Sequence, residues 1–191
     1  MAEYTKGEKS KEHLIRCAAR LFIRKGYNGT GINDILESAE LSKGSFYFYF
    51  PSKKDLAIAV AEYFNNIEMR ELSEASKNRT WVPFVEKFIG DIINRAKQNK
   101  IFGCPFAVLG MEIAFLEPDI ANRYYRPLKN IQDVFEDVLK RSGMSAEEAV
   151  EYAERALAIY EGYLIFYRID KDVETLEKLL RDMKGVINKN N

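Results

Sequence analysis

The chain has 191 residues, of which 47% are hydrophobic and 30% are charged, and these proportions are ordinary for a soluble globular protein. Lys plus Arg and Asp plus Glu both number 29, so the net charge gives no information about a nucleic-acid partner. No run of residues approaches the roughly 20 apolar positions that span a bilayer, and no signal-peptide core stands at the amino terminus. The two cysteines are far apart, which excludes a disulfide framework and a zinc-like spacing. We therefore expect a cytoplasmic protein with no membrane segment, no metal and no cofactor.

The first two helices are predicted from apolar spacing and from residues that end helices. Residues 2–10 are polar and indicate a frayed arm. From Lys11 onward, apolar residues recur at helical spacing as far as Gly26, which is typical of a helix end. After a short loop, Thr30 is the expected N-cap of a second helix that ends at Ala39.

Two more helices follow closely. A tight turn leads to Ser42, the expected N-cap of a third helix over residues 43–50, and a proline follows this helix. Ser52 and Asp55 predict a capping box for a fourth helix over residues 53–72. Two short helices that are joined by a tight turn and followed by a capped long helix are typical of a helix-turn-helix motif.

The rest of the chain is also predicted to be helical. The polar stretch 73–80 marks a border between two functional halves. Beyond it, apolar residues at helical spacing predict five helices, over residues 81–99, 105–116, 119–141, 146–168 and 173–187. Pro127 is expected to kink or divide the third of these. The predicted fold class is all-α, with domains at 1–52 and 73–191 and a connecting helix at 53–72.

The third predicted helix carries residues that are typical of a DNA-reading helix. Residues 41–54 contain three lysines and no acidic residue. Lys43, Gly44 and Ser45 lie at the amino end of the helix, where small and basic residues let a helix enter the major groove and donate to bases and phosphates. Each residue alone is also typical of a solvated surface, so it is their arrangement that indicates DNA binding.

Aromatic residues follow on the same helix. The hydroxyls of Tyr47 and Tyr49 are placed to donate to phosphates, while Phe46 and Phe50, four positions apart, are expected to pack inward. Lys53 and the backbone N–H groups at the start of the next helix form a predicted phosphate site. The alternative interpretation is that the aromatic residues are only core and that the lysine is an ordinary surface residue.

Residues 14–56 resemble the DNA-binding region of TetR-family (tetracycline-repressor-like) transcriptional regulators. The matching positions are Leu21, Phe22, Gly26, Tyr27, Thr30, Asp34, Ile35, Ala39, Ser42, Lys43, Gly44, Tyr47, Tyr49, Phe50, Ser52, Lys53 and Leu56. The sequence departs from the family at Glu40, where the family usually has a glycine in the turn. Because glutamate adopts a left-handed backbone less readily than glycine, either the turn differs or strain is accepted. Its carboxylate would also weaken DNA binding.

The resemblance implies an all-α DNA-binding domain with residues in defined roles. The residues expected to contact the DNA backbone are Thr30, Lys43, Tyr47, Tyr49 and Lys53, with Ser42 at the start of the recognition helix. Those expected to face bases are Gly44, Ser45 and Phe48, the last of them against a thymine methyl group. The expected core is Leu14, Ala18, Leu21, Phe22, Ile35, Leu36, Leu41 and Phe46. Cys17 lies among these residues and is interpreted as a small buried hydrophobe rather than a reactive thiol.

The resemblance also implies a homodimer whose two recognition helices lie about one DNA turn apart on an inverted-repeat operator. In this family two carboxyl-terminal helices of each subunit form a four-helix interface, for which residues 146–168 and 173–187 are suitable. The expected interface residues are Leu157, Tyr160, Leu164, Leu176, Leu179, Leu180 and Met183. The alternative is that these apolar stripes only form the core of one subunit.

Family members bind an inducer in the carboxyl-terminal domain, and the aromatic residues there predict a pocket for a small hydrophobic or electrophilic molecule. The candidate lining residues are Phe84, Phe88, Cys104, Phe106, Met111, Phe115, Tyr125 and Tyr163. Cys104 stands at the amino end of a predicted helix, where the helix dipole and Lys100 would stabilise a thiolate. The surrounding sequence is similar to a stretch in a subset of TetR-family regulators, some of which respond to electrophiles through cysteine. A buried structural cysteine is the alternative.

These features together predict a DNA-binding transcriptional regulator, with repression the common mode in the family, that a small-molecule inducer releases from double-stranded DNA. One alternative is a helical ligand-binding or scaffold protein with no DNA role. Another is an enzyme, but the chain has a single histidine, His13, and no recognisable nucleophile–base pattern. Glu112 is an isolated candidate carboxylate, and no metal-ligand spacing is present. We therefore expect no enzymatic activity.

Overall fold

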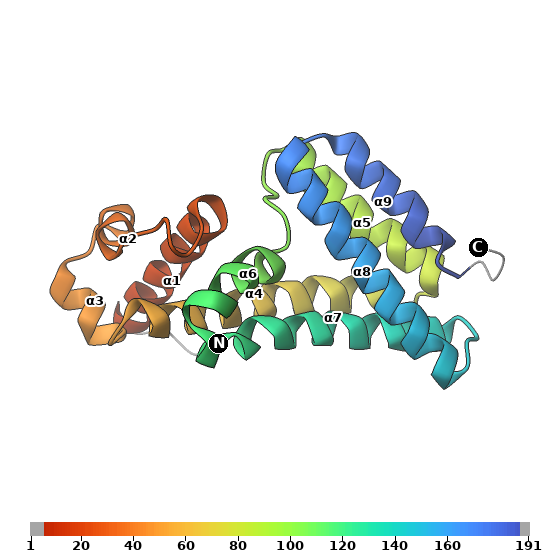
Figure 1. Ribbon diagram of the computed structural model, residues 1–191, viewed down its shortest axis with the longest axis horizontal. Coiled ribbons are helices and arrows are strands. Elements are labelled where there is room, and N and C mark those ends of the chain that lie inside the picture. Colours follow the sequence, from red (N-terminus) through yellow and green to blue (C-terminus); the bar gives the residue numbers. More distant parts are fainter. Residues whose placement is uncertain (1–5, 188–191) are drawn as a thin grey trace. The chain divides into compact units, whose positions relative to one another are not determined.

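Helices make up the fold of the described part of the chain. The computed structural model describes residues 6–187, and no strand occurs among them. The helices, in chain order, are α1 (Lys6–Lys25), α2 (Ile32–Ala39), α3 (Lys43–Tyr49), α4 (Lys53–Ser76), α5 (Trp81–Lys97), α6 (Pro105–Leu116), the 3-10 helix η1 (Pro118–Ile120), α7 (Asn122–Arg141), α8 (Ala146–Asp170) and α9 (Val173–Gly185) (Figure 1). The predicted all-α fold class is confirmed. Over residues 6–187, no helix combines the length and the apolar character that a bilayer crossing requires.

The chain divides into two compact units that are not continuous in sequence. The first unit contains the described residues up to Asn66 together with Pro105–Tyr125, and the second contains Ile67–Cys104 together with the described residues from Arg126 onward. This division differs from the predicted borders, because α6 packs with α1 although the two helices lie far apart in sequence. Helical periodicity along a chain does not reveal a packing relation of that kind.

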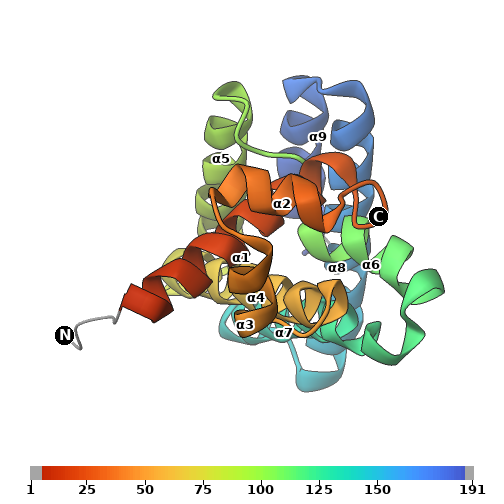
Figure 2. The same ribbon diagram turned by 90° about the vertical axis from the view of Figure 1, so that its left-hand side faces the viewer.

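The first unit has a core formed by one face of α1 together with α2, α3 and α4 (Figure 2). Apolar residues three or four positions apart on α1 share this face because of the 3.6-residue helical period. The predicted core residues that are buried are Leu14, Cys17, Ala18, Phe22, Ile35 and Phe46. Three others from the prediction are only partly buried: Leu21, Leu36 and Leu41.

The second unit has an aromatic core. Helices α5, α8 and α9 pack side by side (Figure 1). The ring of Trp81 lies 5.6 Å from that of Phe135, and the ring of Phe88 lies 5.5 Å from that of Tyr160. The indole Nε1–H of Trp81 donates to the carbonyl oxygen of Met183 at 2.7 Å, which ties the start of α5 to α9. Aromatic pairs of this kind stabilise a core by about 0.5–1.5 kcal/mol each beyond the apolar area that they bury.

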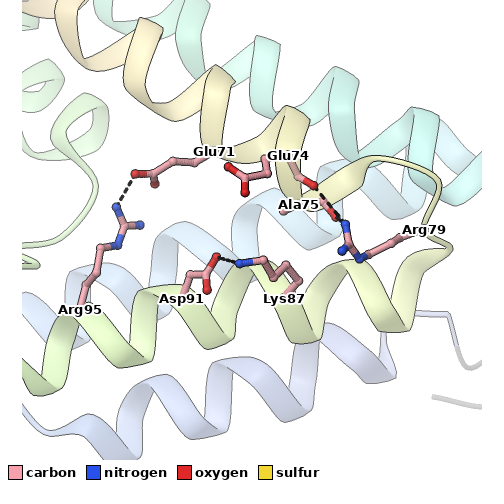
Figure 3. Close-up of polar contacts among 7 residues, drawn as sticks. All are labelled: Glu71, Glu74, Ala75, Arg79, Lys87, Asp91 and Arg95. Atoms are coloured by element: carbon pink, nitrogen blue, oxygen red, sulfur yellow. Dashed lines mark hydrogen bonds and ion pairs between the residues drawn. The ribbon is translucent and has the colours of Figure 1, made fainter.

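Two helix ends differ from the sequence predictions by four or more residues. Residues 6–10 form the first turns of α1, so the expected start at Lys11 is wrong, and residues 2–5 of the expected arm lie outside the described range. Lysine and glutamate are good helix formers, which explains this extension. Helix α4 continues to Ser76 because Arg79 Nη1 donates at 3.0 Å to the carbonyl oxygens of Glu74 and Ala75 (Figure 3). These bonds occupy carbonyl groups that the helix end leaves without partners.

Two local predictions about α7 and α2 are also corrected. Pro127 lies inside α7, which runs on to Arg141, so the proline does not divide the helix, and the expected kink stays a prediction. A proline this close to a helix start removes a single hydrogen bond, and the rest of the helix compensates for that loss. The N-cap of α2 is Gly31 rather than Thr30. The Asp34 carboxylate accepts the Gly31 N–H at 2.7 Å, so this helix start is capped by an acidic side chain within α2.

Candidate nucleic-acid interface

The amino end of α3 is capped and exposed. Ser42 is its N-cap, as predicted, and the serine Oγ accepts the backbone N–H of Ser45 at 3.2 Å. Lys43 and Gly44 are exposed in the first turn, which contains no acidic residue. An ammonium group and small residues at an exposed helix start can approach phosphates and base edges closely.

The aromatic residues of α3 separate cleanly into an inner and an outer set. Phe46 and Phe50 are buried, as predicted, whereas Tyr47 is 48% exposed and Phe48 is 81% exposed. Leaving a phenylalanine in water forgoes roughly 2 kcal/mol of burial free energy. An outward aromatic face on a short helix therefore contributes little to folding, and a contact with a partner would gain the free energy of burying it.

Lys53, at the start of α4, lies over aromatic rings of the first unit. Its Nζ is 4.2 Å from the ring centroid of Tyr27 and 6.0 Å from that of Phe22. Burial lowers the pKa of Lys53 from its ordinary value, and the negative charges of nearby carboxylates oppose this shift. The Asp55 N–H donates to Ser52 Oγ at 3.2 Å, which is one of the two bonds of the predicted capping box, and the Ser52 hydroxyl donates to the Asp55 carboxylate. The cation is thus held in position by its surroundings.

Thr30 does not lie where the predicted contact with the DNA backbone requires it. The residue is fully buried, and its Oγ1–H donates to the carbonyl oxygen of Gly26 at 2.8 Å. The hydroxyl is therefore used inside the loop between α1 and α2, where it satisfies a buried carbonyl group. Thr30 shapes this loop, and its side chain is not presented at the surface.

Glu40, in the turn between α2 and α3, has a left-handed backbone. Its φ is 52° and its ψ is 40°, so the turn keeps the conformation that glycine favours and accepts the strain. A residue other than glycine in this region costs about 1 kcal/mol. The side chain is exposed, which leaves a negative charge next to the acid-free segment of α3.

Carboxylates at and beyond α6 bind the loop after α1, a feature that the sequence did not indicate. Glu112 Oε2 accepts the backbone N–H of Asn28 at 3.0 Å. The Tyr27 hydroxyl donates to Glu117 Oε1 at 3.3 Å. Burial raises the pKa of Tyr27 to about 12, and the Glu117 carboxylate adds to the shift. Glu117 also pairs with Lys54 at 3.3 Å. Glu112, considered above only as an isolated catalytic carboxylate, has a structural partner in this loop.

Comparisons with known proteins agree with the arrangement of this site. Residues 14–60 match the family model described as bacterial regulatory proteins, tetR family. Residues 82–182 match the C-terminal domain of LmrA/YxaF-like transcriptional regulators. The chain belongs to the TetR family. It is therefore a transcriptional regulator with a DNA-binding helix-turn-helix, and the prediction that it is not an enzyme is confirmed by its family.

Curated TetR-family relatives align along nearly the whole chain. A helix-turn-helix-type regulator in the lacX 3′ region of Lactococcus lactis subsp. lactis is 28% identical over 172 residues, which is 88% of each chain. The repressor NemR of Escherichia coli (strain K12) is 24% identical and covers 93% of this chain and 94% of its own.

Solved TetR-family structures have the same fold. A regulator from Agrobacterium tumefaciens superposes with a TM-score of 0.85 at 23% identity, over 94% of this chain and 98% of its own. The reduced form of E. coli NemR superposes with a TM-score of 0.83 at 23% identity, over 93% and 96% of the two chains.

The residues predicted to line an inducer pocket in this TetR-family chain are divided equally between the two units. Phe84, Phe88, Cys104 and Tyr163 belong to the second unit, whereas the other four belong to the first. Those four are Phe106, Met111, Phe115 and Tyr125. Phe106 is buried in the first unit, while the remaining three are exposed, Phe115 by 89%. The predicted set therefore stays a prediction as a single site, and an aromatic side chain on a helix does not by itself reveal which core it enters.

The predicted dimer residues are mostly part of the subunit's own core. Tyr160, Leu164, Leu176, Leu179 and Met183 are buried within the second unit, and Leu157 and Leu180 are partly buried. The apolar residues of α8 that face outward are others: Phe166 is 60% exposed and Ile169 is 77% exposed. Most of the predicted residues are therefore not accessible to a partner in this structure, and the position of a dimer interface stays a prediction.

Two hollows on the second unit lie on the outer side of α8. One, of about 730 Å³, is lined by residues that include Val82, Tyr152, Arg155, Ile159 and Arg181, and it contains none of the predicted ligand residues. The other, of about 360 Å³, is lined by Phe166, Ile169 and neighbouring polar residues, and it includes Tyr163 from the predicted set.

Cys104, in the segment before α6, is buried and forms no disulfide. Its polar neighbour is the carboxyl group of Glu161 on α8. The Nζ of Lys100 donates instead to Gln98 Oε1 at 2.7 Å on the surface, so the expected lysine beside the thiol is directed elsewhere.

Proposed function

We propose that this TetR-family regulator is a repressor that binds an inverted-repeat operator as a homodimer and is released from DNA by a small molecule. The observation that carries the proposal is the outer face of α3, where an acid-free start with an exposed lysine precedes an aromatic residue that is 81% exposed. The name of one relative, the transcriptional repressor NemR, supports repression as the sign of regulation.

In this proposal α3 is the recognition helix in the major groove. Gly44, Ser45 and Phe48 face bases, with the Phe48 ring against a thymine methyl group. The residues assigned to phosphates are Ser42, Lys43, Tyr47, Tyr49 and Lys53. Lys53 is already ordered over the Tyr27 ring, so placing its charge near a phosphate costs little side-chain entropy.

The dimer of the proposal uses the outer face of α8. Ile159, Gly162, Phe166 and Ile169 follow the helical period and share that face. No described atom lies within 4 Å of where a Cβ on Gly162 would stand. A glycine inside a helix is destabilising by roughly 0.5–1 kcal/mol relative to alanine, and the packing of this subunit offers no compensation. A glycine at position 162 is explained if α8 of a second subunit approaches this face closely, because a side chain there would keep the two helices apart.

Release from DNA is proposed to act through α6. Helix α6 begins directly after Cys104, where the chain passes from the second unit to the first. Glu112 on α6 accepts a hydrogen bond from the backbone of the loop after α1. A small hydrophobic or electrophilic molecule that shifts the segment before α6 would move this loop and the helix-turn-helix attached to it. Allosteric couplings of this type are typically about 1–3 kcal/mol, which corresponds to a 5–150-fold loss of DNA affinity.

The first experiment measures fluorescence-anisotropy binding to the DNA that flanks the chain's own gene, at two salt concentrations, with a scrambled duplex as control. Specific binding by a dimer, with affinity that falls steeply with salt, is expected because phosphate contacts release counterions. Lys43→Ala is expected to weaken binding to the operator and to the scrambled duplex by similar factors.

A loss of sequence preference alone in Lys43→Ala would contradict the phosphate role of this lysine. If neither the flanking DNA nor a genome-wide binding selection yields a site, operator binding is refuted and a ligand-binding role without DNA takes its place.

A further inference from the structure

A buried acidic cluster lies inside the second unit. It consists of Glu68 on α4 and Glu161 on α8, with Tyr160 and Cys104 as their polar neighbours. The two carboxyl groups are close enough for the charge of Glu68 to act on Glu161. All four residues belong to the same compact unit. The proposed operator binding and release assign no role to this pair of acids.

Glu161 lacks the hydrogen bonds that a buried carboxyl group requires. Both of its carboxylate oxygens are inaccessible to solvent, and among residues 6–187 no nitrogen or oxygen donor is bonded to them. The Cys104 thiol faces this group, but a thiol is a weak donor. A buried polar group without a partner destabilises the folded state, and more strongly when it is charged. The site therefore has an unmet requirement for a strong donor.

The carboxyl group of Glu68 has only one weak hydrogen bond more than that of Glu161. The Tyr160 hydroxyl donates to its Oε1 at 3.4 Å, which is long for an O–H···O bond. The nearby cation, Arg95 on α5, uses its Nη1 for Glu71 at 2.7 Å instead (Figure 3). The guanidinium of Arg95 is thus directed to an acid outside the pair. The charge of Glu71 also acts unfavourably on Glu68.

Burial and mutual repulsion favour the protonated form of both carboxyl groups. Burial raises the pKa of Glu68 to about 7, with the Glu71 charge adding to the shift and Arg95 and Tyr160 opposing it. Burial also raises the pKa of Glu161 to about 7, where the Cys104 thiol opposes the shift and Glu68 adds to it. A cation placed between the two groups would reverse this preference, because an opposite charge favours the ionised form.

Aromatic rings line the side of the cluster that Tyr160 occupies. The Tyr160 ring lies 5.5 Å from that of Phe88 and 6.1 Å from that of Phe135. Aromatic faces attract cations, and acids next to aromatic faces are the usual elements of a site for an organic ammonium group. A metal ion fits less well, since among residues 6–187 no group of three or more His, Cys, Asp or Glu side chains is placed to hold one.

We propose that the buried acidic cluster binds the nitrogen of an aromatic or aliphatic amine, with the ammonium group donating to Glu161 and Glu68 and the apolar body resting on the rings. This inference names the chemical class of the releasing ligand and so rests on the proposed function. The segment 102–104 packs against α8 beside the site, because the Arg168 side chain donates to the Phe102 carbonyl oxygen, a Cβ on Gly103 would lie 3.3 Å from Leu164 O, and Cys104 faces Glu161. A ligand that enters displaces this segment, which leads directly into α6.

The test is isothermal titration of the full chain with phenylalkylamines of one to four methylene groups, each against the phenylalkanol of equal length. The wild-type chain is expected to bind at least one amine ten times or more tightly than its alcohol. Glu161→Gln and Glu68→Gln keep the shape of each side chain and remove its charge, and each is expected to reduce that preference at least tenfold. Glu154→Gln on α8 and Glu74→Gln on α4 remove the same charge from exposed positions and are expected to preserve it.

Two results would overturn the inference: no amine in the series binds more tightly than its alcohol, or the preference survives in both buried variants. Operator binding is measured separately by anisotropy, so the two proposals fail independently. A chain that binds the operator but shows no amine preference refutes the inference alone. A chain that binds amines through Glu161 but no operator refutes the repressor proposal and supports the amine site.

Discussion

At the scale of single residues, Phe48 is the side chain whose exposure is best explained by DNA. We expect Phe48→Ala to weaken operator binding about 5–30-fold, because a ring against a thymine methyl group contributes on the order of 1–2 kcal/mol. Stability should change by less than about 0.5 kcal/mol, since the ring is 81% exposed. Anisotropy and thermal unfolding measure the two effects.

The control for this variant is Phe46→Ala on the same helix. Phe46 is fully buried, so its truncation is expected to cost about 3–5 kcal/mol of stability. A large stability loss in Phe48→Ala, or unchanged operator binding, would contradict the outward role assigned to that ring.

Gly26 is required by its backbone and by its neighbour. Its φ is +84°, and a Cβ there would lie 2.4 Å from Glu112 Oε1. We expect Gly26→Ala to lower stability by more than the roughly 1 kcal/mol of a left-handed alanine. Gly143→Ala is the matched control, because Gly143 has a φ of +95° and no described atom within 4 Å of its Cβ position.

The difference in unfolding free energy between the two alanine variants isolates the effect of the Glu112 side chain. Equal losses in Gly26→Ala and Gly143→Ala would show that the carboxylate moves aside without cost.

At the scale of helices, the acids facing each other from α4 and α8 make stability depend on pH. Glu68 and Glu161 have an ordinary pKa near 4.5 when unfolded and of about 7 when folded, because burial raises both. Between these values the folded state binds more protons than the unfolded state, so the free energy of unfolding falls as pH rises from about 4.5 to about 7. The groups that modify this titration are Glu71, Arg95, Tyr160 and Cys104.

We expect a loss of several kcal/mol across this range, because each group contributes about 1.4 kcal/mol for every unit by which its pKa is raised, and it is measured as a falling midpoint in chemical denaturation. The double variant Glu68→Gln with Glu161→Gln should flatten the profile. An unchanged slope in that variant would place the titrating groups elsewhere.

Helix positions were predictable where a local capping residue marks them. Ser42 and Ser52 cap α3 and α4 through their own side chains, and these starts follow from a few neighbouring residues. The end of α4 was not predictable, because it depends on Arg79, which folds back onto carbonyl groups of the preceding turn. The contact of Glu112 with the loop after α1 could not be predicted from the sequence either, because it joins residues 84 positions apart.

The two candidate surfaces differed in predictability for physical reasons. The DNA-facing residues lie on one short amphipathic helix, and the spacing of Phe46 and Phe50 separates inside from outside. Helix α8 is apolar on both faces, so the sequence did not separate the core face with Leu164 from the outer face with Phe166. Ligand-binding residues were harder still to predict, because the sequence does not show that a glutamate such as Glu161 is buried without hydrogen-bond partners.

At the scale of the whole molecule, dimerisation is the property most open to test. We expect Phe166→Glu to produce monomers and to weaken operator binding at least tenfold, because burying an unpaired charge in an apolar interface is strongly unfavourable. Analytical ultracentrifugation measures the mass, and anisotropy measures the binding.

Val150→Glu is the matched control for the dimer prediction. Val150 is also an exposed apolar residue of α8, but by the 3.6-residue period it lies on the opposite side of the helix from Phe166. A dimer that persists in Phe166→Glu, or that is lost equally in Val150→Glu, would move the interface away from the outer face of α8.

The contact between Gly26 and Glu112 also restricts the order in which this sequence can diverge. A side chain at position 26 requires the Glu112 carboxylate to move, in addition to the strain of the positive φ, so it is better tolerated after residue 112 has been shortened. Shortening residue 112 first removes the acceptor of the Asn28 N–H and weakens the hold on the loop. A substitution at either position alone is therefore expected to lower stability. The two positions are expected to change together among descendants of this chain.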